Sequence, residues 1–112
     1  MKKAAETPLL AAPAHLWDGI RQLPGSLELW EDRVVFRFSN FKDSHLNLTI
    51  LLAQIELVEE YLVFDLARNG LRFQSKNGWC DLFVLEEGVH EFKKAVLAQV
   101  RARVMRREER SR

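Results

Sequence analysis

The chain has 112 residues, of which 47% are hydrophobic and 29% are charged. This size and composition are typical of one folded domain, and they exclude an intrinsically disordered chain. The formal net charge of +1 is unevenly distributed, because residues 101–112 hold six arginines and two glutamates, a balance of +4 that leaves −3 for the other 100 residues. The sequence therefore predicts a mildly acidic domain with a basic C-terminal tail.

The cysteine content and the apolar runs indicate the compartment. Cys80 is the single cysteine, so it has no intramolecular partner for a disulfide, which favours a reducing compartment. Apolar residues near the N-terminus are interrupted by Pro13, too early for a signal-peptide core. The strongest apolar run, residues 49–53, is far shorter than the ~20 residues that span a bilayer. We therefore expect a cytoplasmic protein.

The first part of the chain is weakly patterned. Residues 1–13 are rich in alanine and proline and are expected to form a flexible lead-in. Residues 15–22 alternate poorly, which leaves a first strand or a short helical turn open. Residues 23–26, Leu-Pro-Gly-Ser, have the composition of a turn, because proline presets φ and glycine accepts a positive φ.

Regular alternation of apolar and polar residues begins at Leu27. Residues 27–30 and 33–38 are expected to form a hairpin around a two-residue reversal at Glu31-Asp32. One face of this hairpin is apolar. On its other face Glu28 is expected to lie across from Arg33 or Arg37.

The middle of the chain contains several further segments with strand character. Glu59-Glu60 is expected to separate two of them, and Asn69-Gly70 and Asn77-Gly78 are expected to be hairpin turns, because type I′ turns need positive φ at both central residues. The predicted strands are residues 46–50, 54–58, 61–66, 71–75 and 79–85.

After Leu85 the apolar spacing changes from two to three and four. Val89, Phe92, Val96 and Val100 form one apolar stripe that continues to Val104, which predicts an amphipathic helix from about Glu87. The predicted fold is α+β, with about seven antiparallel strands in two strongly bent, near-orthogonal sheets. The C-terminal helix would close the open end of this barrel.

No constellation of catalytic or metal-binding residues is apparent. His15, His45, His90 and Cys80 lie far apart, with none of the spacings typical of metal ligands. No glycine-rich loop precedes the predicted helix, so a phosphate-binding loop is not indicated. We expect no enzymatic activity, no cofactor, no metal and no small-molecule substrate.

Two sets of side chains are candidates for contact with a partner. Exposed tryptophans often mark binding surfaces, although packing under loops is the more common alternative. Arginines at the helix end could contact an anionic membrane or simply be solvated. A nucleic-acid partner is not expected, because no aromatic residues are interleaved with these arginines. The candidate contact residues are Trp30, Trp79, Arg101, Arg103, Arg106 and Arg107.

Three blocks carry a resemblance to a known family. They are LPGSLELWEDRVVFRF (residues 23–38), LLAQIELVEE (51–60) and NGLRFQSKNGWCDLFVL (69–85) running into the helix. In this order they resemble the GRAM group of pleckstrin-homology (PH)-like domains over roughly residues 15–104. The resemblance implies a PH-like barrel at residues 14–104, between the lead-in 1–13 and a basic tail at 105–112.

The resemblance also implies a class of function. Relatives that hold phosphoinositide head groups use clustered lysines and arginines around the loop between the first two strands, whereas this sequence offers only Arg21 there. The resemblance therefore implies a non-enzymatic interaction module that binds a protein or peptide, or associates with itself as a homo-oligomer. Peripheral binding to anionic membrane lipids through the arginine-rich C-terminal end is the alternative.

Overall fold

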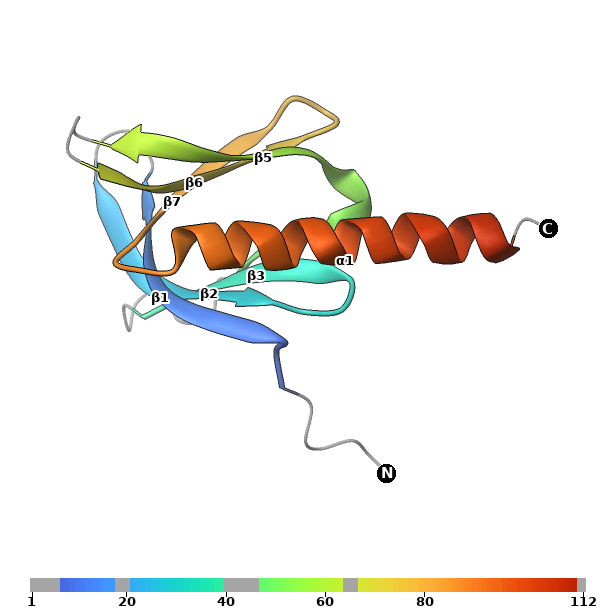
Figure 1. Ribbon diagram of the computed structural model, residues 1–112. Helices are drawn as coiled ribbons and strands as arrows, with labels where there is room; N and C mark the ends of the chain where they lie inside the picture. Colours follow the sequence, from blue (N-terminus) through green and yellow to red (C-terminus); the bar gives the residue numbers. More distant parts are fainter. Residues whose placement is uncertain (1–6, 18–20, 40–46, 64–66, 111–112) are drawn as a thin grey trace.

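The computed structural model describes residues 7–17, 21–39, 47–63 and 67–110 of the 112-residue chain (Figure 1). These residues form seven strands, a short 3₁₀ helix and one long α-helix. In chain order they are β1 (Leu10–Trp17), β2 (Gln22–Leu29), β3 (Arg33–Phe38), β4 (Asn47–Leu51), η2 (Leu52–Gln54), β5 (Ile55–Val63), β6 (Ala67–Ser75), β7 (Cys80–Leu85) and α1 (Val89–Arg110).

The strands form one antiparallel sheet in the order β4-β3-β2-β1-β7-β6-β5. Strand β1 joins the β2–β4 half of the sheet to the β5–β7 half. It pairs with β2 over its whole length and with β7 from Ala14 to Trp17. The predicted number and antiparallel pairing of the strands are confirmed, whereas the prediction of two separate sheets is not. The sheet curves so that β5 and β6 lie on the opposite side of α1 from β1–β3 (Figure 1).

The core fills the space between the inner face of this sheet and α1. Phenylalanines from three strands meet at its centre, with the ring centroid of Phe83 5.2 Å from that of Phe36 and 5.7 Å from that of Phe73. All three side chains are buried, and no polar or charged side chain among the described residues is buried with them. The apolar alternation of β2, β3, β6 and β7 therefore converges on one core.

Helix α1 covers the open side of the sheet with the stripe that the sequence predicts. Val89, Phe92 and Val96 are 6%, 1% and 0% exposed, and Val100 packs against the same core. The chain enters the helix through Gly88, which has a φ of 80°. Val104 is 47% exposed, and the last turns extend past the sheet (Figure 1). The apolar stripe therefore packs against the core from Val89 to Val100, and Val104 lies largely outside the core.

Two predicted turns are present. Trp30 N–H donates to the carbonyl oxygen of Arg33 at 2.7 Å and closes the two-residue Glu31-Asp32 loop. Across this hairpin Arg37 pairs with Glu28 at 3.0 Å, as the alternation predicts. The Asn77-Gly78 turn between β6 and β7 is also present.

Three predicted breaks are instead parts of strands. Pro24-Gly25 lies within β2, where a Cβ on Gly25 would clash with the Arg37 carbonyl oxygen and the Phe36 ring. This glycine permits close packing and makes no turn. The lead-in also ends earlier than predicted, because residues 10–13 pair with β2 in β1.

The other two breaks lie on β5 and β6. Glu59-Glu60 is inside β5, where Glu59 pairs with Arg72 at 2.8 Å and Glu60 with His90 at 2.9 Å. Asn69-Gly70 is inside β6, and Gly70 pairs with both β5 and β7. The connection from β5 to β6 falls at residues 64–66, outside the described residues.

Candidate functional site

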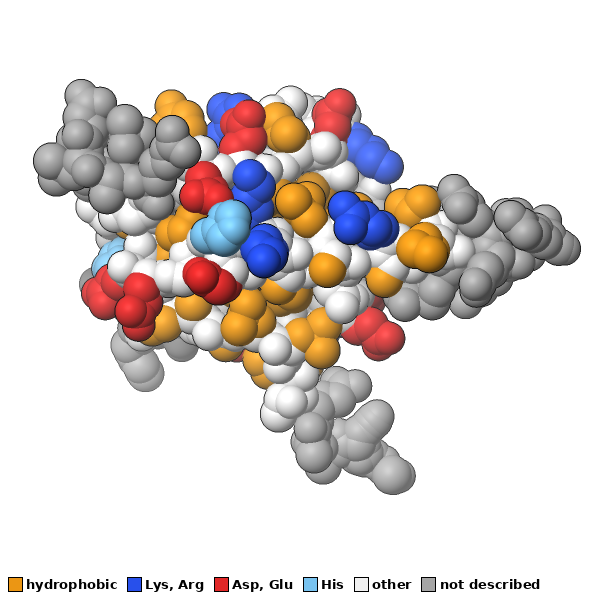
Figure 2. Space-filling view, in the orientation of Figure 1, with side chains coloured by type: hydrophobic (Ala, Val, Ile, Leu, Met, Phe, Trp, Pro, Cys, Tyr) orange, Lys and Arg blue, Asp and Glu red, His pale blue; other side chains and the backbone are white. Residues whose placement is uncertain are grey.

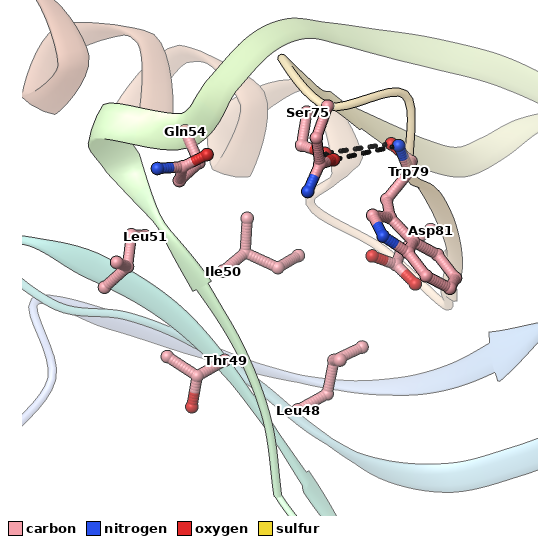
Figure 3. A pocket seen from close by; sticks show the side chains of 9 residues that line it. Leu48, Thr49, Ile50, Leu51, Gln54, Ser75, Trp79 and Asp81 are labelled. Atoms are coloured by element: carbon pink, nitrogen blue, oxygen red, sulfur yellow. Dashed lines mark hydrogen bonds between the residues drawn. The ribbon is translucent and has the colours of Figure 1, made fainter.

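A groove separates β4 from the β6–β7 hairpin (Figure 3). Its volume is about 460 Å³, within the range typical of ligand sites. β4 and η2 form one wall, and the hairpin forms the other. The described side chains that line it are those of Leu48, Thr49, Ile50, Leu51, Gln54, Ser75, Asn77, Trp79 and Asp81.

Two backbone hydrogen bonds fix the width of this groove at its η2 end. Leu52 N–H donates to the Asp32 carbonyl oxygen at 3.0 Å, which ties the start of η2 to the β2–β3 turn. Lys76 N–H donates to the Gln54 carbonyl oxygen at 2.8 Å, which ties the end of η2 to the β6–β7 hairpin. η2 therefore bridges the two walls at this end, while β4 itself stays unpaired with the hairpin.

The wall formed by β4 is an open sheet edge. Among the described strands, β4 pairs only with β3, in a register that sets Ile50 opposite Val34. Hydrogen-bonded and non-hydrogen-bonded residue pairs alternate along an antiparallel ladder. Because Leu52 N–H bonds to Asp32, the pair two residues away, Ile50 and Val34, is also hydrogen-bonded, and the pairs that contain Thr49 and Leu51 are not. The backbone N–H and C=O groups of Thr49 and Leu51 then point away from β3. As the N-cap residue of η2, Leu51 uses its C=O as the acceptor of the first 3₁₀ turn. The outward groups for which no described residue is a partner are therefore the N–H and C=O of Thr49 and the N–H of Leu51.

The other edge of the sheet, β5, is protected against strand pairing. Its register with β6 shifts between Ile55 and Leu57 and again between Tyr61 and Val63. It also carries three glutamates, at 56, 59 and 60. Shifts and charges of this kind discourage pairing with another chain, whereas β4, with the sequence NLTIL, has an unbroken register and no charge. The edge that remains suited to pairing is β4.

Trp79 stands on the opposite wall, held by the hairpin turn. Gly78 N–H donates to the Ser75 carbonyl oxygen at 3.0 Å, and Ser75 N–H donates to the Trp79 carbonyl oxygen at 2.8 Å. With a φ of 97° at Gly78, this is a three-residue loop and not the two-residue type I′ turn that the sequence predicts. The Asn77 side chain accepts hydrogen bonds from the Ser75 hydroxyl and from Trp79 N–H. The backbone is thus fixed while the indole is 70% exposed.

Asp81 lies beside Trp79 on the same wall. Alternation along β7 places the Asp81 side chain on the same, inward-facing side of the strand as those of Phe83 and Leu85. The side chains of Phe83 and Leu85 are apolar and buried. Burial raises the pKa of Asp81 above its ordinary value of 3.8. It is the one ionisable side chain among the described lining residues, and no described residue forms an ion pair or hydrogen bond with it. The groove therefore contains a partly desolvated carboxyl group without a counter-ion.

The sequence-predicted contact residues fall in three separate places. Trp79 lines the groove, whereas Trp30 lies at the β2–β3 turn, where its Nε1–H donates to Glu28 at 2.9 Å. The Arg33 guanidinium lies over the Trp30 ring, 5.1 Å from its centroid. Trp30 is therefore already engaged within the domain.

The arginines are on the last turns of α1. Arg101 is exposed and Arg103 half-buried, while the side chains of Arg106 and Arg107 lie outside the described part. This face of the molecule shows basic and apolar side chains interspersed along the helix (Figure 2). Val104 and Met105, which follow Arg103 on the helix, are 47% and 57% exposed.

Within the described ranges, no three histidine, cysteine or acidic side chains come together as they would around a metal ion. No described helix has both the length and the apolar character needed to cross a bilayer.

Comparison with known proteins identifies the fold. No family model and no curated protein matches the sequence. Among solved structures, the C-terminal domain of an unknown protein from Leishmania infantum is similar with a TM-score of 0.74 and 13% identity, covering 87% of this chain and 86% of that one. The Vps36 N-terminal PH domain is similar with a TM-score of 0.69 and 16% identity, covering 94% and 86%. With its seven antiparallel strands and one C-terminal helix, the chain has a PH-like fold.

Proposed function

We propose that this PH-like domain is a non-enzymatic interaction module that binds an extended segment of a partner protein along β4. The open, uncharged edge of β4 beside the groove carries this proposal. An added strand would satisfy the outward N–H and C=O of Thr49 and the outward N–H of Leu51, which is the usual mode of β-strand addition.

The groove supplies the second requirement, a place for the side chains of the added strand. Leu48 and Ile50 point across it toward the wall that holds Trp79 (Figure 3). Every second side chain of a strand paired with β4 would enter the same space, since side chains alternate across a sheet. An exposed tryptophan on a fixed backbone is also a typical anchor of a binding surface.

The test is a backbone substitution that removes one outward donor. Peptides would be selected from a phage-displayed random library on the intact protein and then measured against Thr49→Pro and Thr49→Ala. Because the Thr49 N–H points away from β3, proline should leave the β3–β4 ladder intact. We expect Thr49→Pro to abolish binding and Thr49→Ala to retain it, with circular dichroism showing both variants folded. Selected peptides that bind a folded Thr49→Pro variant as tightly as the native chain would overturn the proposal.

This proposal includes the finer assignments suggested by the sequence. Residues 14–104 are assigned to a GRAM-like PH domain on the three sequence blocks quoted above. A cytoplasmic location is supported by the single, exposed Cys80, because an exposed unpaired thiol suits a reducing compartment.

A second candidate function involves the end of α1. The exposed apolar side chains of Val104 and Met105 beside Arg101 and Arg103 favour contact with another copy or with an anionic membrane. Deleting residues 101–112 should leave the fold intact, since Val100 is the last helix residue that packs against the core. If truncated and full-length proteins have the same mass by light scattering and the same binding to phosphatidylserine vesicles at low and high salt, this second function is wrong.

A further inference from the structure

The groove at β4 contains an unusual pairing of side chains. Asp81 occupies a core-facing position near the start of β7, and Trp79, two residues earlier, stands beside it (Figure 3). A carboxyl group at such a position opposes folding, because it loses hydration without gaining a counter-ion. Apolar side chains fill the next two inward positions, so Asp81 is the exception on this face.

The chemistry around Asp81 defines what would complement it. The remaining described lining residues are apolar or neutral polar, so the groove has a net negative charge. Lys76, although adjacent in the hairpin, lines a different hollow, next to Val100 on α1. A carboxylate without a protein cation and an accessible indole face are the two groups that bind an ammonium or guanidinium ion.

On the basis of the proposed strand addition, we propose that the partner segment carries a lysine or arginine whose cationic group lies between the Trp79 ring and the Asp81 carboxylate. The side chain would come from a position of the added strand that faces the same way as Leu48 and Ile50, the two β4 residues that point toward this wall. Its aliphatic stem would contact these residues, while its charged end reached Asp81.

A cationic partner would make an acidic residue compatible with this inward position. In the free domain no described residue supplies a counter-ion to the Asp81 carboxylate, whereas in the complex the carboxylate gains both an ion pair and a charge-assisted hydrogen bond. The groove would thus discriminate against a neutral or acidic side chain at the same position of the peptide, because such a side chain leaves the partly buried carboxylate without a partner.

The test uses fluorescein-labelled peptides with one alternating Thr/Val sequence, differing only in a central Lys, Arg, Gln or Glu. Binding would be measured by fluorescence anisotropy against the native chain, Asp81→Asn and Trp79→Ala. Glu56→Gln, an exposed acid on β5 outside the groove, and Leu9→Ala, an exposed apolar residue outside the groove, are the matched controls.

We expect the Lys or Arg peptide to bind the native chain about tenfold or more tightly than the Gln peptide, the usual effect of a hydrogen bond to a charged group. Asp81→Asn should remove this preference while keeping the binding of the Gln peptide. Trp79→Ala should weaken the basic peptides, and both controls should behave like the native chain.

Three outcomes would contradict these expectations in different ways. Equal binding of the four peptides, lost in Thr49→Pro, would keep the strand addition and refute the cation site. A second outcome is a preference for basic peptides that persists in Asp81→Asn and falls in Glu56→Gln or at high salt. That result would attribute the preference to the overall negative charge of the domain and refute the cation site at Asp81. Binding of none of the peptides, together with a library selection that yields no Thr49→Pro-sensitive peptide, would refute strand addition itself.

Discussion

Substituting Phe92 with alanine tests whether α1 is a required part of the fold. Phe92 is 1% exposed and lies in the first turns of the helix, between Val89 and Val96, which are 6% and 0% exposed. These three helix residues belong to the same core cluster as Phe36, Phe73 and Phe83 of the sheet. The substitution therefore removes a whole ring from the place where the helix meets the sheet.

The size of the effect follows from this burial. Truncating a fully buried phenylalanine costs about 3–5 kcal/mol, because transfer and cavity terms add. A chain of this length has a free energy of unfolding of roughly 6–17 kcal/mol by the usual per-residue range. Phe92→Ala should therefore remove between about a fifth and four fifths of the free energy of unfolding. The remaining contacts of Val89 and Val96 should keep the native fold populated.

Urea unfolding followed by circular dichroism measures the loss, provided that the slope of the transition is unchanged. Val104→Ala is the matched control on the same helix, since Val104 is 47% exposed. It should change the free energy of unfolding by less than about 1 kcal/mol, and alanine even favours the helix. A loss below about 1 kcal/mol for Phe92→Ala would show that α1 does not seal the core.

Three further substitutions test local features. Gly25→Ala should destabilise the domain by about 1–3 kcal/mol in urea unfolding, because its Cβ would overlap the Arg37 carbonyl oxygen and the Phe36 ring; an unchanged midpoint would refute this packing. Gly78→Val should lose a similar amount, about 1–3 kcal/mol, since its φ is 97°, and a neutral result would exclude the positive-φ turn. Asp81→Asn should raise stability at neutral pH, because folding raises the pKa of this carboxyl group and so penalises its charged form. The native chain should lose stability relative to this variant as pH rises from below 3.8 through the folded pKa, and a pH-independent difference would contradict the burial of the charge.

Features that depend on neighbouring residues could be predicted from the sequence. The stripe Val89, Phe92 and Val96 follows from helical spacing alone, and it is buried as expected. The Glu31-Asp32 reversal joins two strands whose apolar residues alternate regularly. Only one pairing register of these strands keeps all their apolar side chains on the same face, so the position of the turn is fixed. Local periodicity was sufficient in both places.

Features that depend on distant residues could not be predicted in the same way. Gly25 has the composition of a turn with Pro24, but its role is set by Phe36 and Arg37 on the next strand. Asn69-Gly70 likewise has the composition of a turn, yet Gly70 lies inside β6 and pairs with both neighbouring strands, β5 and β7. In each case tertiary packing overrides the local preference of the residue pair. The start of β1 was missed for the same reason, because its alanines gain strand structure by pairing with β2.

The candidate site divides in the same way. Trp79 was a candidate from the sequence, but β4 could be recognised as an open edge only once the strand order was known. Asp81 carried a local signal that the sequence reasoning missed. It shares the alternation of Phe83 and Leu85, so an acid at this position interrupts an apolar face of β7.

That interruption links the stability of the domain to its proposed function. If Asp81 served the fold alone, an apolar residue there would complete the core face of β7, and nothing in the described structure compensates the carboxylate for its lost hydration. A group that opposes folding and faces an accessible groove is what a binding site for a cation requires, since the partner supplies the missing charge. Asp81→Asn should accordingly change two measurements in opposite directions, a higher stability of the free domain and a weaker binding of basic peptides. If Asp81→Asn gained stability but kept the preference for basic peptides, Asp81 would oppose folding without binding a cation. The proposed cation site would then be refuted.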